Sequence, residues 1–478
     1  MLLTDLIAEI CTIKIIGNVD VDIKNICADS RKVTPGDLFV AINGVAVNGH
    51  KFIGTAIENG AKVVFCEQCP AEINPEVTYV LVDDTTDCLG KLASAYYDYP
   101  SEKLIIIGVT GTNGKTTIAT LLYELYKELG YKVGLLSTVC NYINGRAIPS
   151  THTTPDALSL QKLLAEMAEE RCYYVFMEVS SHSVDQKRIS GINFDGAVFT
   201  NITRDHLDYH KTFNNYIKAK QEFFTNLPIH AFALTNADDK NGKIITQNSQ
   251  ANVYSYSLET HANFKAKVLE ESMDGMLLNI DNKELYVRLI GHFNAYNILA
   301  VYGVTKILRT PTEDVLVALS NLKPVNGRFE CYRLKNGACA VIDYAHTPDA
   351  LENVLNTVKD INKTGKTICV VGCGGNRDKG KRPMMAKIAV KLSDEVFFTA
   401  DNPRDEEVKD IINDMLAGLT EDEKMNVTCI EDRKEAILEA CNVAEKDDVV
   451  LIAGKGHETY QEIKGVKHHF DDKEIILK

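Results

Sequence analysis

A strand, a glycine-rich loop and a helix follow one another around residues 108–117, GVTGTNGKTT, and this feature most constrains the fold. The run LIIIGV before the loop is apolar throughout, which predicts a buried strand. The run TTIATLLYELYKELG has apolar residues at helical spacing and ends at Gly130, which predicts an amphipathic helix. A glycine-rich loop between a strand and a helix is typical of phosphate binding in α/β proteins.

The loop departs from the pattern G-x-x-x-x-G-K-[ST] at one position, because Val109 stands where the first glycine should be and Gly108 comes one residue early. Backbone N–H groups from Gly111 to Lys115 can still converge on phosphate oxygens. Lys115 can neutralise the β- and γ-phosphates, and Thr116 can hold Mg²⁺. The alternative, a tight turn before a helix, gives no reason for a lysine at this place. We therefore expect a nucleotide here.

The length of 478 residues predicts about three domains. We expect a small mixed α/β domain over 1–100, a central P-loop ATPase-like α/β domain over 101–326 and a Rossmann-like α/β domain over 327–478. Turn-rich stretches at 97–103 and 323–330 mark the two junctions. Within the last domain, the strands KTICVVG, EVFFTA and DDVVLIAG each end in a polar loop. Loops at the carboxyl ends of parallel strands are where open α/β sheets bind ligands.

Composition and charge exclude several classes of partner. The net charge of −14 argues against binding to nucleic acid or to an anionic membrane, which requires a basic face. No apolar run approaches membrane-spanning length, and the N-terminus lacks the basic region of a signal peptide. The thirteen cysteines are scattered and form no complete zinc motif. Reduced thiols in a cytoplasmic protein are the better interpretation.

Three further positions suggest chemistry but leave alternatives open. Glu178 follows the strand YYVFM and could coordinate magnesium, or could be a solvated acid at a strand end. His206 and His210 have the spacing of a metal pair on a helix, but no glutamate lies between them as in a zinc protease. Lys220 falls within the apolar face of the helix FNNYIKAKQEFFTNL. Burial would lower its pKa and let the neutral amine bind CO₂ as a carbamate; the alternatives are an acidic partner or a head group that reaches water.

Several longer motifs resemble the muramyl (Mur) ligase family. They are TGTNGKTT, THTTPD at 151–156, EVSSHSVDQKR at 178–188, NITRDHLDYH at 201–210 and the lysine of IKAK. DSRKVTPGDLF at 29–39, GCGGNRDKGKRPM, DNPR and AGKGHE are similar to the members that extend a UDP-N-acetylmuramoyl dipeptide. The resemblance covers essentially the whole chain. It implies a UDP-binding N-terminal domain, a central ATP-binding domain and a C-terminal domain that binds the incoming amino acid.

The resemblance also implies the reaction. ATP phosphorylates the free carboxylate of UDP-N-acetylmuramoyl-L-alanyl-D-glutamate, and the amine of meso-diaminopimelate attacks the resulting acyl phosphate. No protein nucleophile is required, so the protein must position three substrates and neutralise their anions. Mg²⁺ is the expected cofactor, and a cytoplasmic monomer without nucleic-acid or membrane partners is expected.

The resemblance assigns roles to individual positions. At ATP it places Thr110, Gly111, Thr112, Asn113, Gly114, Lys115, Thr116, Asn297, Arg328 and Asp343. Along the sugar-peptide it places Ser30, Thr153, Thr154, Ser181, Gln186 and Arg188. It implies one magnesium held by Thr116 and Glu178, and a second held by His206 with Lys220 modified to a carbamate (N6-carboxylysine). The expected catalytic residues are Lys115, Lys220, His206 and Glu178.

The resemblance implies that the DNPR motif at 401–404 selects the amino acid, because in the family it accompanies the diaminopimelate-adding members; ordinary turn chemistry is the alternative. An arginine side chain can bind the distal carboxylate of meso-diaminopimelate with two hydrogen bonds, whereas lysine as a substrate has no distal carboxylate. The residues expected at this substrate are Arg377, Asp401, Asn402, Pro403, Arg404, Gly454 and Glu458. Asn376 departs from the family, which commonly has aspartate before the arginine. The alternatives are a lysine-adding relative, a folylpolyglutamate synthetase-like ligase, and a non-enzymatic ATP-dependent binding module.

Overall fold

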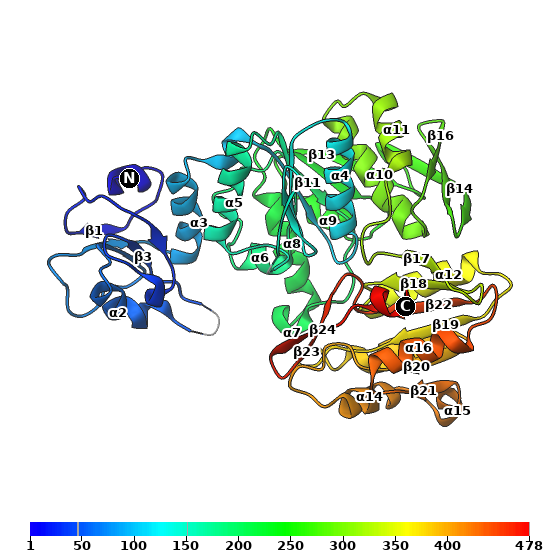
Figure 1. The fold of residues 1–478 in the computed structure, drawn as a ribbon. Helices are drawn as coiled ribbons and strands as arrows, with labels where there is room; N and C mark the ends of the chain where they lie inside the picture. The colour runs from blue at the N-terminus through cyan, green and yellow to red at the C-terminus, as the bar shows by residue number, and fades with distance from the viewer. Residues whose placement is uncertain (45–46, 151, 478) are drawn as a thin grey trace.

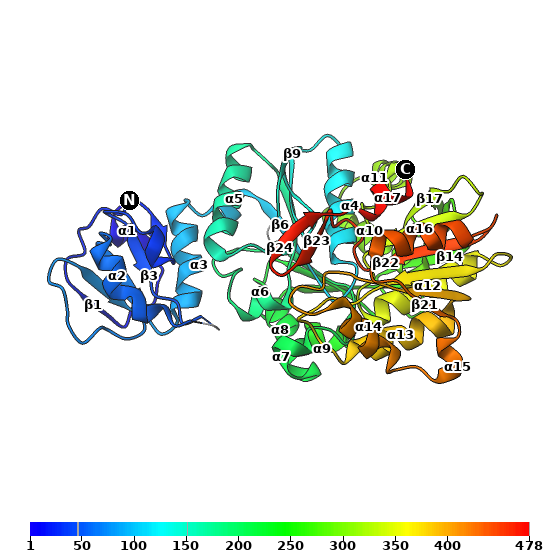
Figure 2. The same ribbon diagram turned by 60° about the horizontal axis from the view of Figure 1, so that its bottom comes forward.

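Three α/β lobes follow one another along the chain, the first at one end of the molecule (Figures 1 and 2). The computed structural model describes residues 1–44, 47–150 and 152–477. Thr151, the first residue of the THTTPD motif, lies outside the described residues. No helix within this described part is both long enough and apolar enough to cross a membrane.

The N-terminal lobe is built on a five-stranded sheet in the order β1-β5-β4-β3-β2. Its strands are β1 (Lys14–Ile16), β2 (Ile26–Cys27), β3 (Leu38–Val40), β4 (Val63–Cys66) and β5 (Thr78–Leu81). Its helices are α1 (Leu3–Leu6), α2 (Ile53–Glu58) and α3 (Thr85–Tyr96), with short 3₁₀ turns η1 (Ser30–Lys32), η2 (Gly49–Phe52) and η3 (Pro100–Lys103). β4 is buried along its whole length, as expected for an apolar run covered on both faces.

The central lobe contains an eleven-stranded sheet in the order β16-β15-β14-β13-β12-β11-β6-β10-β7-β8-β9. Its strands are β6 (Ile105–Thr110), β7 (Val133–Leu136), β8 (Asn141–Ile143), β9 (Arg146–Ile148), β10 (Tyr174–Glu178), β11 (Gly196–Phe199), β12 (Phe232–Asn236), β13 (Asn252–Ser257), β14 (Phe264–Ser272), β15 (Gly275–Ile280) and β16 (Lys283–Val287). The strands from β7 to β14 in this order are parallel, and the two ends of the sheet are antiparallel.

Two apolar cores cover the faces of this sheet. One includes residues of α4 (Lys115–Glu128), α10 (His292–Ile307) and α11 (Thr312–Asn321). The other includes residues of α5 (Ala157–Glu169), α6 (Ser181–Asp185), α8 (Phe213–Thr225) and α9 (Gly242–Thr246), while the short α7 (Leu207–His210) precedes α8. β6 lies between β10 and β11, where the strand order reverses, so the loop after β6 opens at the place where such sheets bind ligands.

The predicted strand, loop and helix around residue 110 are present as β6 and α4. Gly111 and Gly114 have φ values of +153° and +88°, and a Cβ on Gly111 would lie 1.8 Å from Thr200 Oγ1. Only glycine fits that contact. The expected alternation of strands and helices is interrupted over residues 252–287, where β13 to β16 follow one another without a helix. The exposed positions scattered along β14 match a half-covered strand.

The C-terminal lobe has a six-stranded sheet in the order β17-β18-β22-β19-β20-β21, with only β17 antiparallel. Its strands are β17 (Glu330–Arg333), β18 (Cys339–Asp343), β19 (Thr367–Val371), β20 (Glu395–Phe398), β21 (Val427–Cys429) and β22 (Val449–Ala453). A separate hairpin joins β23 (Tyr460–Ile463) and β24 (Val466–His469). The helices are α12 (Pro348–Ile361), α13 (Lys381–Leu392), α14 (Val408–Leu416), α15 (Glu421–Lys424), α16 (Arg433–Val443) and α17 (Asp472–Ile476).

Candidate active site between the central and C-terminal lobes

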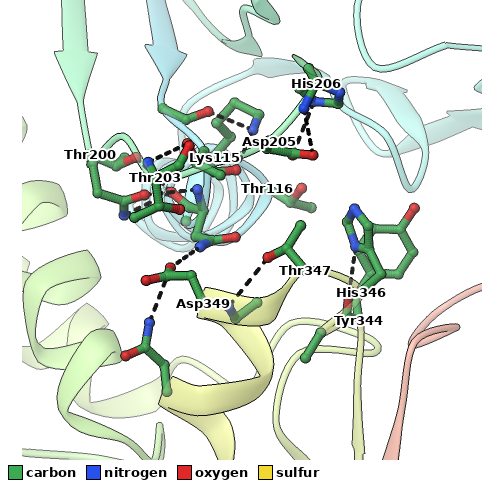
Figure 3. A pocket seen from close by; sticks show the side chains of 18 of the residues that line it. Lys115, Thr116, Thr200, Thr203, Asp205, His206, Tyr344, His346, Thr347 and Asp349 are labelled. Carbon is green, nitrogen blue, oxygen red and sulfur yellow. Dashed lines mark hydrogen bonds and ion pairs between the residues drawn. The ribbon is translucent and has the colours of Figure 1, made fainter. Parts of the chain in front are cut away.

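A cavity of about 830 Å³ lies between the central and C-terminal lobes. The loop after β6 and the ends of β10 and β11 line one side of it. The loops after β18, β19, β20 and β22 line the other side, so each contributes the carboxyl end of a parallel strand. Figure 3 shows Lys115 and Thr116 on one side and Tyr344, His346 and Thr347 on the other. The cavity can therefore bring together ligands bound to different lobes.

The glycine-rich loop, residues 110–116, is held in shape by its neighbours. Asn113 N donates to Asn201 Oδ1 at 2.9 Å, and Thr200 Oγ1 donates to the Asn113 carbonyl at 2.6 Å. Lys115 Nζ donates to the carbonyls of Gly111 and Thr112, each at 2.8 Å. Burial of the Lys115 ammonium lowers its pKa. An anionic phosphate beside this nitrogen would favour its charged form.

Glu178 ends β10 beside this loop and is 1% exposed. Thr116 Oγ1 donates to Glu178 Oε2 at 2.9 Å, and Thr138 N donates to Oε1 at 2.7 Å. Arg328 Nη2 reaches Thr116 Oγ1 at 3.1 Å from the C-terminal lobe. The hydroxyl and carboxylate oxygens are the ligand type that Mg²⁺ prefers. The described residues include no group of three or more His, Cys, Asp or Glu able to hold a metal, so phosphate or water would supply further ligands.

Lys220 projects from α8 into the base of the same site and is 1% exposed. Its Nζ donates to the Gly111 carbonyl at 2.9 Å and to Thr110 Oγ1 at 3.3 Å, and lies 4.9 Å from the ring centre of Tyr216. Burial, with a smaller effect of the nearby Lys115, holds the Lys220 pKa well below its usual value. A head group that reaches water is therefore wrong for Lys220. A desolvated neutral amine fits the chemistry of carbamate formation.

The two histidines of NITRDHLDYH have different surroundings. His206 precedes α7 with φ of +53°, and its Nε2 lies 3.2 Å from Asp205 Oδ2. Burial lowers the pKa of His206 to about 3, which leaves the imidazole neutral and able to bind a metal. His210 instead pairs its Nε2 with Ser181 Oγ at 2.9 Å. The ring centre of His182 lies 4.8 Å from that of His206, a neighbour that no sequence pattern indicated.

The residues expected along the sugar-peptide divide into two groups. Thr153, Thr154, Ser181 and Arg188 line the cavity, with Arg188 Nη1 donating to the Thr154 carbonyl at 3.0 Å. Gln186 lies behind them and accepts from Arg188 Nε at 3.0 Å. Ser30 begins η1 in the N-terminal lobe and does not line this cavity.

Two of the remaining ATP positions, Asn297 of α10 and Arg328 of the C-terminal lobe, contact the glycine-rich loop. A Cβ on Gly114 would lie 2.7 Å from Asn297 Oδ1, so the asparagine packs directly on the loop. Asp343 accepts from Phe329 N at 2.8 Å, and burial raises its pKa to about 6. The Arg328 guanidinium lies 4.5 Å from the ring centre of Tyr344. A planar cation and a ring at this point suit a nucleotide.

The residues expected at the amino acid meet around the loops after β20 and β22. Asn402 Nδ2 donates to Glu458 Oε2 at 2.8 Å, and Lys455 Nζ donates to the same oxygen at 2.9 Å. Lys455 is fully buried and was missed in the sequence. Gly454 has φ of +114°, and a Cβ there would lie 2.7 Å from Asp401 Oδ2. Arg377 and Arg404 also line the cavity, whereas Pro403 does not.

The departure at Asn376 has a local explanation. Its φ of +53° lies in the left-handed region, which asparagine tolerates better than most residues. Asn376 N donates to Glu406 Oε1 at 2.6 Å, and its Nδ2 donates to Asp405 Oδ2 at 2.6 Å. An aspartate at this position would place a second carboxylate beside Asp405. The amide therefore holds the loop before Arg377 without repulsion.

Models of three protein families match consecutive parts of the chain. The Mur ligase family catalytic domain matches residues 22–97, the Mur ligase middle domain 109–305 and the Mur ligase glutamate ligase domain 327–456. A UDP-N-acetylmuramoyl-L-alanyl-D-glutamate--2,6-diaminopimelate ligase from Phocaeicola vulgatus is 58% identical over 477 residues, which are 100% of this chain and 99% of that protein. The chain belongs to the Mur ligase family.

Other proteins that are similar to this Mur ligase belong to the same family. The enzyme of the same name from Bacteroides fragilis is 57% identical, covering 100% of this chain and 98% of its own. A solved structure of that name superposes with a TM-score of 0.70 at 32% identity, covering 100% of this chain and 98% of the other. MurF from Thermotoga maritima in complex with ADP has a TM-score of 0.61 at 21% identity, covering 90% and 93%. The predicted family resemblance and three-part α/β fold class are confirmed.

Several residues of this Mur ligase's cavity were not predicted. They include Asp205, Tyr344, His346, Asp349 and Lys381. Lys381 Nζ donates to the His346 carbonyl at 2.8 Å, and burial lowers the pKa of His346 to about 4. The motif DYAHTPDA contains three of the five, but only Asp343 was selected from it. The available signal was a polar loop directly after the carboxyl end of a buried strand.

Proposed function

We infer that this chain is an ATP-dependent ligase that joins meso-diaminopimelate to UDP-N-acetylmuramoyl-L-alanyl-D-glutamate in peptidoglycan precursor synthesis. Relatives named as this ligase are 52–58% identical over 477 residues. The observation that carries the inference is the single cavity that joins the phosphate loop to Arg377 and Arg404. A ligase of this kind must hold a nucleotide and a doubly acidic amine in one enclosure.

The reaction needs binding and charge neutralisation from the protein. A carboxylate oxygen of the D-glutamate attacks the γ-phosphorus of ATP. The bond from that phosphorus to the oxygen between the β- and γ-phosphates breaks, which releases ADP. The diaminopimelate nitrogen then attacks the acyl carbon, phosphate leaves, and the nitrogen releases a proton. Lys115 and the loop N–H groups would bind the phosphates, and Arg328 would add a cation near Thr116. Neutral His206 would not repel a cation placed beside it, and burial disfavours the charged form of Lys220.

We place Mg²⁺ at two points. Thr116 and Glu178 would hold one ion, and His206 with Lys220 as a carbamate would hold the second. The ions would neutralise the phosphate oxygens as their charge is redistributed. The support is the pair of buried oxygen atoms 2.9 Å apart and the low pKa of Lys220.

Each of the three domains would bind one of the three substrates. Residues 1–100 with Ser30 would bind the uridine end, 101–326 ATP, and 327–478 the amino acid. Thr153, Thr154, Ser181, Gln186 and Arg188 would guide the sugar-peptide toward Glu178. The remaining ATP contacts would come from Asn297, Arg328 and Asp343. We also propose a monomer in the cytoplasm, which agrees with thirteen unpaired cysteines.

The amino-acid site would use opposite charges for the two ends of the substrate. Arg377 and Arg404 would meet carboxylates, while Asp401, Asn402 and Glu458 would accept from ammonium groups. Gly454 would admit the backbone of the substrate, and Pro403 would stiffen the loop. The lysine-adding alternative has no carboxylate for Arg404. Folylpolyglutamate synthase from Mycobacterium tuberculosis has a TM-score of 0.64 at 18% identity over 78% of this chain, which indicates a shared fold alone.

The substitution Arg404→Ala tests the proposal. Loss of a charged hydrogen-bonded pair costs about 2–5 kcal/mol, so KM for diaminopimelate should rise by one to several orders of magnitude. KM for ATP should change little, because Arg404 belongs to the amino-acid end of the cavity. Phosphate release is measured with diaminopimelate, lysine and no amino acid. Equal losses for ATP and diaminopimelate would contradict the assignment, and ATP binding without amino-acid-stimulated hydrolysis would favour the binding module.

A further inference from the structure

The hairpin β23–β24 lies across the DNPR loop. Arg404 N donates to the Glu462 carbonyl at 3.0 Å, and Lys464 N donates to the Arg404 carbonyl at 2.8 Å. Glu462 N donates to Asn402 Oδ1 at 2.9 Å, and Gln461 Nε2 donates to the Asp401 carbonyl at 2.8 Å. The hairpin therefore fixes both the backbone and an acceptor side chain of the loop that carries the selective arginine.

The side chain of Arg404 is also held from behind. Its Nε donates to Glu462 Oε2 at 3.1 Å, and its Nη1 donates to the Gly375 carbonyl at 2.9 Å. Arg404 lines the cavity and Glu462 does not. The two bonds use the single N–H of Nε and one of the two N–H groups of Nη1. No other hydrogen-bond partner of Nη1 or Nη2 occurs among the described residues, so the guanidinium can still donate to a carboxylate.

We propose that Glu462 is a positioning residue for the amino-acid substrate, and that it orients the Arg404 guanidinium toward the second carboxylate of that substrate. The proposal rests on the proposed function. Arginine has several rotatable bonds, so an unsupported side chain would have to be ordered when the substrate binds. Glu462 and Gly375 fix the guanidinium plane before binding, which removes that cost from the affinity.

An oriented Arg404 would distinguish amino acids with two carboxylates from those with one. A diamino acid with a distal carboxylate gains from a correctly oriented Arg404, whereas lysine has no group to place there. Loss of Glu462 should therefore weaken the binding of diaminopimelate and leave any activity with lysine nearly unchanged. A loss of folding would affect both substrates and ATP together.

Three variants of the full-length enzyme test this. Glu462→Ala removes the acceptor, Glu462→Gln keeps an acceptor oxygen without the charge, and Glu462→Asp withdraws the carboxylate by one methylene. Glu407→Ala is the matched control, because Glu407 is 72% exposed in its side chain and pairs at 3.5 Å with Lys464 of the same hairpin. KM and kcat are measured for ATP, for the UDP-linked dipeptide and for diaminopimelate, with lysine as the comparison.

We expect KM for diaminopimelate to rise about tenfold in Glu462→Ala and severalfold in Glu462→Asp, and to stay within about threefold in Glu462→Gln. KM for the other two substrates, kcat at saturation and the thermal midpoint should stay near wild type. An unchanged KM for diaminopimelate overturns the proposal, as do parallel rises for all three substrates or an equal effect of Glu407→Ala. A wild-type enzyme that does not use diaminopimelate refutes the proposed function itself, whereas failure in the variants alone refutes only the role of Glu462.

Discussion

Lys220 shows how burial can prepare a side chain for chemistry. A lysine on a helix surface is normally charged and solvated, but here the amine is enclosed by α8, the glycine-rich loop and the Tyr216 ring. Desolvation disfavours the ammonium, and the proximity of Lys115 adds to that effect. Carbamate formation would convert this nitrogen into an anionic oxygen ligand for a cation. The role of a buried lysine beside a phosphate loop is therefore testable by chemical replacement.

Lys220→Ala should lower kcat by at least two orders of magnitude, because the second metal would lose its anionic ligand. Added formate or acetate should restore part of the activity by occupying the vacated space. Lys218→Ala is the control, since Lys218 lies on the exposed side of the same helix. Phosphate release is measured with and without the added acid. Full activity of Lys220→Ala without any acid would reject the metal-bridging role.

At the scale of elements, one buried ion pair connects the substrate loops to the C-terminal helix. Arg433 begins α16 and Asp472 begins α17, and both side chains are completely buried. Arg433 Nη2 donates to Asp472 Oδ2 at 2.7 Å and to the Ala453 carbonyl at 3.1 Å, and Nη1 donates to the Ala400 carbonyl at 3.3 Å. Those carbonyls directly precede Gly454 and Asp401, so the pair supports both loops at the proposed amino-acid site.

Asp472→Ala should lower the free energy of unfolding by about 3–5 kcal/mol, because it leaves the Arg433 charge buried without its partner. Urea unfolding followed by circular dichroism measures the change. The surface pair of Glu421 and Lys424 serves as the control, since the Glu421 side chain is 89% exposed and its removal should have little effect. Similar destabilisation by Glu421→Ala would contradict the special weight given to the buried pair.

Local patterns predicted the elements around the site better than its long-range contacts. The strand, glycine loop and helix were predictable because each has a characteristic period or turn residue. The resemblance carried by longer motifs predicted the ligase activity, which relatives of 52–58% identity confirm. Arg433 and Asp472 could not be paired from the sequence, since they are 39 residues apart in segments with the composition of a protein surface. Glu462 was missed for the same reason, because its partner Arg404 is 58 residues away.

At the scale of the molecule, a second contact, besides that of Arg328 with Thr116, joins the phosphate loop to the C-terminal lobe. Asn113 Nδ2 donates to Asp349 Oδ2 at 2.8 Å, and Asp349 lies in the first turn of α12 (Figure 3). Burial raises the pKa of Asp349. One partner belongs to each lobe, so the bond can form only when the two lobes lie close together.

Asp349→Ala should weaken closure and lower kcat by about tenfold, because substrates on different lobes would be aligned less often. Small-angle X-ray scattering of the ATP-bound enzyme should give a larger radius of gyration than wild type. Glu352→Ala, on an exposed position of the same helix, is the control. An unchanged kcat together with an unchanged radius of gyration would show that the contact does not contribute to closure.

The separation of the N-terminal lobe from the cavity has a consequence for substrate length. The described residues that line the cavity begin at Gly111, while Ser30 lies in the lobe at the far end of the molecule (Figure 1). Under the proposed function, one molecule of substrate must span that interval to be held at its uridine and at its carboxylate. The enzyme would thus measure its acceptor from end to end, and a peptide of the right sequence but without the nucleotide would be held at one end only.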